Sequence, residues 1–228
     1  TAITELDSLL ENYPKEIMAF FGDFVSMGTI EGFLSLEFFA WMPVILAIYA
    51  ISEGSGALAG EEGDGTLELL LGNPIPRWRV VVEKFAAFVL SLLAITVVII
   101  LFGMVTVLGV DVEISYLRLT LAMLNLLPFL LAVGSFSLFG SALLPNRRMA
   151  ALAGAVITIY SYLFDSLGKI VERIEFLRPY TLYHYADAGV PLREGLNWSH
   201  IGVLMGFTVV LLGLAVCAFE RRDLAARG

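Results

Sequence analysis

Five stretches of the chain contain no Asp, Glu, Lys or Arg and are almost entirely apolar. They cover residues 38–52, 85–110, 119–146, 149–164 and 201–219. A helix that crosses a bilayer needs roughly 20 mainly apolar residues, so the first stretch must include Glu53 and continue to Ala59, and the fourth must continue past Asp165. The pattern therefore predicts five membrane-spanning helices, at about 35–59, 81–109, 119–144, 149–168 and 200–219.

The composition agrees with this pattern. The chain of 228 residues is 58% hydrophobic and 16% charged, with a mean hydropathy of +0.84, whereas soluble domains are typically about 25% charged. Five such stretches in one short chain favour a membrane protein over a soluble protein with buried core helices. We predict an all-α membrane protein, a polytopic helical bundle that forms a single transmembrane domain over residues 1–228.

The distribution of Lys and Arg predicts how the bundle lies in the membrane. Eight of the 14 cations lie in the loop at 60–84, the link at 145–148 and the tail from Glu220, while six are spread over the longer segments of the other side. Because cytoplasmic loops carry the excess of cations, we expect the first side, with the C-terminus, to be cytoplasmic. The first residue then lies outside, which predicts one more helix before it and six in the whole protein.

The acidic residues follow the opposite distribution. About 14 of the 22 fall on the outer side, so the net charge of −8 is almost entirely outside the cytoplasm. Nucleic acid is therefore not an expected partner, because phosphate contacts require cations. Residues 1–32 have apolar side chains at helical spacing and predict an outer amphipathic segment. Residues 169–199, rich in Tyr and Trp, predict an outer hairpin that is re-entrant or interfacial.

The segment at 60–79 separates the first two predicted spans and is charged and amphipathic. Thr66 to Leu71 can form a short helix that starts near Asp64 or Thr66 and ends at Gly72 and Asn73. Leu67, Leu70 and Leu71 share one face of this helix, and prolines stiffen the return to the membrane. An interfacial loop explains its Trp and Arg residues, but a docking surface for a protein also explains its acidic residues.

Few residues are candidates for chemistry within the spans. Glu53 is an ionisable group within an apolar stretch, which points either to a translocation pathway or to a carboxylate near the inner headgroups. We also expect Asn125, on the third predicted helix, to be a pathway residue. The serines of that helix have no histidine or lysine at matching depth to activate them. His184, His200 and Cys217 do not form a metal-ligand spacing, so we predict no catalytic residue, metal site or cofactor.

The order of residues in the 60–84 loop resembles the signature of type 2 ATP-binding-cassette (ABC-2 type) exporter permeases. That pattern reads roughly E-x-x-x-G-T-x-E-x-L-L, then P-x-x-R, then G-K-F, and Glu83 stands here where its last glycine is usual. The ending Phe219–Leu224, FERRDL, and the order of helices are also similar to that family. The residues on which the resemblance rests are Glu61, Gly65, Thr66, Glu68, Leu69, Leu70, Pro74, Arg77 and Lys84.

The resemblance implies a function. In the family, a separate ATPase subunit docks on a cytoplasmic coupling helix, here about residues 63–71, and two permease chains form the pathway. The eight residues from Glu61 to Arg77 are then the expected coupling residues, and the protein is a multi-pass protein of the plasma (inner) membrane of a prokaryote. ATP hydrolysis is expected in the partner, because this chain lacks a G-x-x-x-x-G-K-[ST] loop.

Two other functions remain open on the sequence. The same loop would serve a non-transporting membrane anchor or sensor that holds a cytoplasmic partner. An intramembrane enzyme is a third class, and the missing base counts against it. The sequence does not identify a transported substrate.

Overall fold

The computed structural model describes residues 38–39, 41–108, 115–186 and 195–222, and regular structure within these ranges is helical throughout. The amphipathic segment predicted at 1–32 and part of the predicted hairpin, 187–194, lie outside the described residues. The helices are α4 (Met42–Gly56), α5 (Ala59–Gly63), α6 (Thr66–Leu71), α7 (Arg77–Leu108), α8 (Tyr116–Leu124), α9 (Leu126–Leu143), α10 (Arg147–Gly168), the 3₁₀ helix η2 (Glu172–Tyr180), α11 (Leu182–Ala186) and α12 (Trp198–Arg221).

Four of the helical segments are long and apolar enough to cross a membrane. They are Arg77–Val105, Tyr116–Leu143, Arg147–Gly168 and Trp198–Arg221, and they correspond to four of the five predicted spans. The first predicted span is shorter than expected, because α4 has 15 residues and ends at Gly56. Pro43 occupies its first turn, where a missing N–H does no harm. The described part of this span therefore crosses less of the bilayer than the range 35–59 implies.

The third predicted helix is interrupted. It starts earlier than predicted, at Tyr116, and breaks at Asn125, where α8 ends and α9 begins. Pro128 explains the break, since it has no N–H to donate to the carbonyl of Leu124 and its ring crowds that carbonyl. The buried Asn125 side chain sits at the break and donates to the carbonyl of Ala186 in α11, at 2.8 Å.

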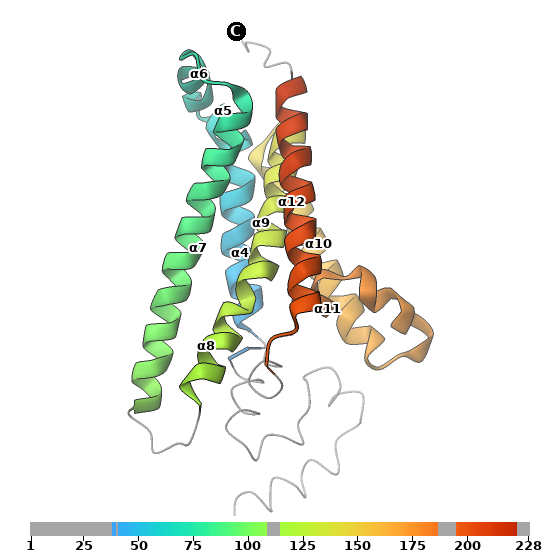
Figure 1. The fold of residues 1–228 in the computed structure, drawn as a ribbon. Coiled ribbons are helices and arrows are strands. Elements are labelled where there is room, and N and C mark those ends of the chain that lie inside the picture. The colour runs from blue at the N-terminus through green and yellow to red at the C-terminus, as the bar shows by residue number, and fades with distance from the viewer. Residues whose placement is uncertain (1–37, 40, 109–114, 187–194, 223–228) are drawn as a thin grey trace, which may run out of the picture.

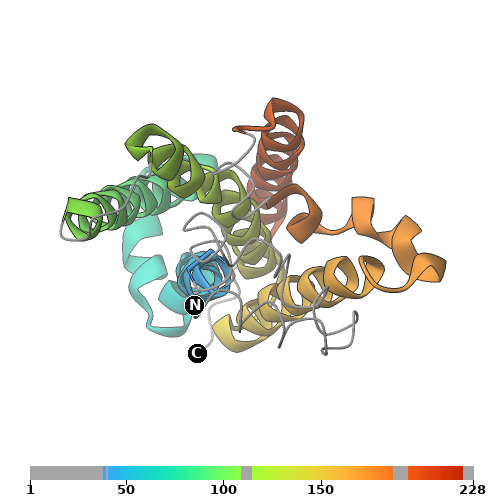
Figure 2. The same ribbon diagram turned by 90° about the horizontal axis from the view of Figure 1, so that it is seen from below.

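The helix α9 lies at the centre of the bundle, with α4, α10, α12 and α7 around it (Figures 1 and 2). Of its 18 residues, 13 are buried. Its small residues allow close approach, and a Cβ added at Gly54 of α4 would collide with the carbonyl oxygen of Gly134. Small side chains let backbones pack closely within a membrane, where dispersion replaces much of the hydrophobic effect.

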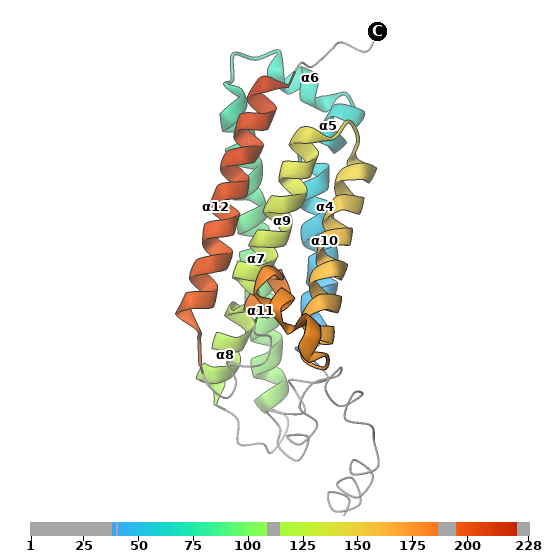
Figure 3. The ribbon, with the colours of Figure 1, turned by 90° about the vertical axis from the view of Figure 1, so that its right-hand side faces the viewer.

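The connections gather at two ends of the bundle (Figure 3). The loop end holds α5, α6, the link between α9 and α10, and the C-terminus of α12. The hairpin end holds the last residues of α7 and the first of α8, with η2 and α11 packed against α10 nearby. This grouping of the segments is the one that the cation pattern predicts.

A buried carboxylate organises the hairpin end. The side chain of Asp165 is 3% exposed and lies 2.7 Å from Lys169 Nζ and 3.2 Å from Arg178 Nε. A buried charge is stabilised only when it is paired and hydrogen-bonded. The pairs therefore hold η2 against the end of α10. Asp165 closes an apolar stretch in the sequence, and nothing in the local pattern singles it out.

Candidate coupling interface and pocket

The loop end contains two short helices where the sequence predicts one. The helix α6 spans Thr66–Leu71, as the local pattern predicts, and Gly65, with a φ of 72°, separates it from α5 within the range of about 63–71 that the resemblance implies for a coupling helix. The left-handed conformation suits glycine, which has no Cβ to clash with the backbone. The hydroxyl of Thr66 reaches back to the carbonyl of Glu61 at 3.2 Å. The glycine and threonine of the predicted pattern therefore define the turn.

The face of α6 that carries Leu67, Leu70 and Leu71 is turned mostly into the bundle. Leu67 is 1% exposed and packs against a cluster formed by Leu58, Val80, Val81, Leu138, Ala142, Ala215 and Phe219. Leu70 and Leu71 are partly buried against the same cluster. The protein's own helices therefore cover Leu67 and part of Leu70 and Leu71, the face that these three leucines share. The side chain of Leu69 is 77% exposed, and Glu68 beside it is exposed as well.

A serine of α9 joins α4 to α5. Ser141 Oγ accepts hydrogen bonds from the backbone N–H groups of Leu58, at 3.2 Å, and Ala59, at 2.8 Å. It donates to the carbonyl of Ser55 at 2.9 Å. Buried backbone groups need such partners, so the hydroxyl fixes the chain where α4 ends. Ser135 and Ser137 donate to carbonyls of their own helix, which gives all three serines structural bonds.

Two predicted coupling residues form bonds with different partners. Glu61 pairs with Lys84 of α7, and both side chains are about one-third exposed, at 29% and 32%. Arg77 does not pair with Glu61. Its guanidinium donates to carbonyls at the end of α12, including that of Arg222 at 2.6 Å. It also lies 6.0 Å from the ring centroid of Phe219, so the start of α7 is fastened to the end of α12.

Arg222 connects more elements at this end than any residue in the predicted coupling set. It pairs with Glu62 of α5 at 2.8 Å. It also donates to the last carbonyls of α9, those of Ser141 at 3.1 Å, Ala142 at 3.4 Å and Leu144 at 3.2 Å. The carbonyls at a helix C-terminus lack partners and carry partial negative charge, which an arginine satisfies. The signal that could have found it is its place in the FERRDL ending.

The remaining members of the predicted set lie at the surface of the loop end. Gly65, Thr66, Glu68, Leu69 and Pro74 are all exposed. The predicted set thus divides into residues that fasten the loop to the bundle, such as Glu61 and Arg77, and residues that face outward. A partner that binds this end would meet the α6 face that carries Glu68 and Leu69.

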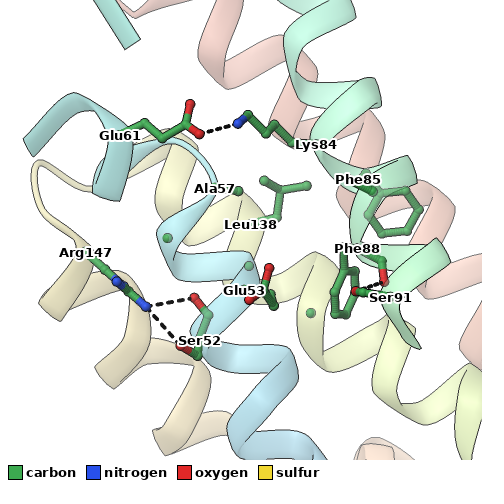
Figure 4. A pocket seen from close by; sticks show the side chains of 14 residues that line it. Ser52, Glu53, Ala57, Glu61, Lys84, Phe85, Phe88, Ser91, Leu138 and Arg147 are labelled. Carbon is green, nitrogen blue, oxygen red and sulfur yellow. Dashed lines mark hydrogen bonds and ion pairs between the residues drawn. The ribbon is translucent and has the colours of Figure 1, made fainter. Parts of the chain in front are cut away.

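A pocket of about 470 Å³ opens next to this interface (Figure 4). Its walls come from α4, α7 and α9, and Arg147 of α10 closes one side. Glu53 is exposed to this pocket, and the Phe85, Phe88 and Ser91 side chains of α7 line the wall that faces α4. Arg147 is turned to Ser52 and donates to its hydroxyl at 2.9 Å. The two predicted pathway residues therefore differ, since Glu53 lines a cavity and Asn125 is enclosed.

These features define a class of protein, a multi-pass helical membrane protein with a small folded surface at one end of its bundle. The family comparison is specific. A model described as ABC-2 family transporter protein matches residues 1–224, and the chain belongs to this family. The resemblance seen in the 60–84 loop is thereby confirmed, and the chain is a transporter membrane component. Comparisons with curated proteins and with solved structures found no match.

Proposed function

We propose that this chain is the permease subunit of an ATP-driven exporter. In this proposal two such chains line the pathway, and a separate ATP-binding-cassette ATPase docks on the loop end, which faces the cytoplasm of a prokaryotic cell. The observation that carries the proposal is the way in which α5 and α6 are attached to the bundle. These helices are fastened to α7, α9 and α12 on one side and present exposed residues on the other.

Such an attachment allows a force on α6 to be transmitted to the membrane helices. A partner that moves α6 also moves Lys84 through Glu61, and the ends of α9 and α12 through Glu62 and Arg222. The buried Leu67 adds an apolar contact worth about 1.5–3 kcal/mol. The loop and the nearby ends of three long helices then move as one body, so ATP-driven movement of a partner would reach the membrane helices without being lost in a flexible loop.

The function is tested with inside-out vesicles that contain this chain with or without its ATPase subunit. We expect ATP-dependent accumulation of substrate only when both subunits are present. A membrane anchor or sensor would hold the ATPase on the vesicles without any nucleotide-dependent accumulation. Binding without movement, over a panel of lipid, peptide and drug-like substrates, would therefore replace the exporter proposal with the anchor.

The docking surface is tested separately with Leu69→Asp. An exposed leucine that becomes buried on binding contributes about 1.5–3 kcal/mol, and about 1.4 kcal/mol is a tenfold change in affinity. We expect at least tenfold weaker capture of the ATPase by Leu69→Asp in a pull-down at fixed salt. Asn73→Asp, also exposed but beyond the end of α6, is the matched control. Equal capture by both variants would remove α6 from the interface.

A further inference from the structure

The pocket between α4 and α7 contains a carboxylate without a partner. Among the residues that the structure describes, none forms an ion pair or hydrogen bond with the Glu53 side chain. Glu53 belongs to a helix of mainly apolar residues, where a lone charge is costly unless it faces a cavity or a ligand. The Glu53 side chain therefore faces the cavity and not a partner among the described residues.

The other charged side chains of the pocket have partners of two kinds, an ion pair and hydrogen bonds to neutral groups. Lys84 pairs with Glu61. The Arg147 guanidinium is turned to Ser52, where it donates to the carbonyl at 3.4 Å as well as to the hydroxyl. The pocket is lined by two carboxylates and two cations, so its formal charges cancel. The attraction for a charged ligand therefore depends on where in the pocket the ligand lies. In Figure 4, Lys84 of α7 is turned toward Glu61, and Arg147 lies on the other side of Ser52 from Glu53.

The wall opposite Glu53 suits a positive charge with an apolar body. Phe85 and the largely buried Phe88, whose ring packs on Gly134, line it, and an aromatic ring attracts a cation that lies within about 6 Å of its centroid. The Ser91 hydroxyl donates to the carbonyl of Phe88 at 2.8 Å, so its oxygen has only lone pairs to offer to the cavity. The volume of about 470 Å³ falls in the range of roughly 300–1,000 Å³ that holds drug-sized ligands.

We propose that this pocket binds lipophilic organic cations, with Glu53 as the counter-ion and Phe85 and Phe88 as the aromatic wall. The binding site rests on the pocket alone. That the bound cation is also a transported substrate rests on the proposed function. The inference then adds a substrate class to that function. A lipophilic cation can enter such a site from the membrane, because its apolar body partitions into lipid before its charge meets the carboxylate.

The probe is radiolabelled tetraphenylphosphonium, and tetraphenylborate, of similar shape and opposite charge, is its counterpart. Equilibrium binding is measured on the full chain in lipid nanodiscs, with empty nanodiscs subtracted for partition into lipid. We expect saturable binding of the phosphonium at one site per chain and no saturable binding of the borate. Saturable binding of the borate alone would assign the pocket to anions held by Arg147 and overturn the proposal.

Variants locate the site. Glu53→Gln keeps the shape and removes the charge, and we expect at least tenfold weaker phosphonium binding. Glu83→Gln is the matched control on α7, because Glu83 pairs with Arg79 at the surface and does not line the pocket; its affinity should stay within twofold. Ala87→Phe fills the cavity from α7 and should abolish binding by a route that does not involve Glu53. Unchanged affinity in either pocket variant would overturn the proposal.

The assay contains no ATPase and no nucleotide, so the two proposals fail separately. Phosphonium binding that depends on Glu53, without ATP-driven movement in vesicles, would retain the cation site and reject the exporter. Transport of other substrates without phosphonium binding would retain the exporter and reject the cation site.

Discussion

At the scale of the residue, Arg222 binds both a carboxylate and the unpaired carbonyls at the end of a helix. Its guanidinium reaches Glu62 and three carbonyls of the α9 terminus. Arg222→Gln should lower the free energy of unfolding by about 1–3 kcal/mol, because buried acceptors lose their donor. Thermal unfolding in detergent measures this, with Arg221→Gln, at the exposed neighbour, as the control. An equal loss in both variants would contradict the assigned role.

The identity of Gly65 has a local physical cause. Its φ of 72° is a conformation that costs other residues about 1–2 kcal/mol, and a Cβ there would meet no atom within 4 Å. Gly65→Ala should therefore lose stability through backbone strain alone. Gly63→Ala, which also has open space and no positive φ, should lose none. Equal melting temperatures of the two variants would show that the turn adapts without strain.

At the scale of the element, α6 has one face that is buried in the bundle and one that is exposed. Leu67 is buried in the apolar cluster of the loop end, whereas Leu69 is 77% exposed. Leu67→Ala should cost about 2–5 kcal/mol of stability, and Leu69→Ala should change it by less than about 0.5 kcal/mol. Chemical denaturation in mixed micelles compares the two. If Leu69→Ala proves the more destabilising, the orientation of α6 described here is wrong.

The helix elements also show where local sequence and packing diverge. The break between α8 and α9 can be explained from the sequence alone, because Pro128 has no N–H to donate to the carbonyl of Leu124. The partner that Asn125 finds there lies 61 residues away, in α11. Periodicity within a helix carries no information about such a contact. The interpretation of Asn125 as a pathway residue stays a prediction, although its burial and its bond to Ala186 favour a structural role.

At the scale of the whole molecule, the orientation in the membrane is the prediction on which the proposed function depends. Asp64 lies at the loop end and Glu172 at the hairpin end, and both are exposed. In a Cys217→Ala background, we expect Glu172→Cys in intact cells to react with a membrane-impermeant thiol reagent and Asp64→Cys to react only after lysis. The reverse labelling would put the loop end outside and rule out a cytoplasmic ATPase on α6.

The sequence by itself determined the class of the molecule. The length and apolarity of four helical spans follow from local composition, since each span satisfies its own backbone hydrogen bonds. The grouping of the loops at two ends follows from the same alternation. The loop signature, together with the order of spans, was enough to indicate the family, because it combines a turn glycine, a short helix and a basic return to the membrane within about 25 residues.

Only the tertiary structure decided which of these residues fasten the loop and which face outward. Helical spacing places Leu67, Leu70 and Leu71 on one face, but it cannot say whether a partner or α7, α9 and α12 cover that face. The same holds for charges, since Glu61 meets Lys84 and Glu62 meets Arg222 across helices that are distant in sequence. Burial and ion pairing depend on what other elements bring to a residue, and so they are set by the packing of the whole bundle.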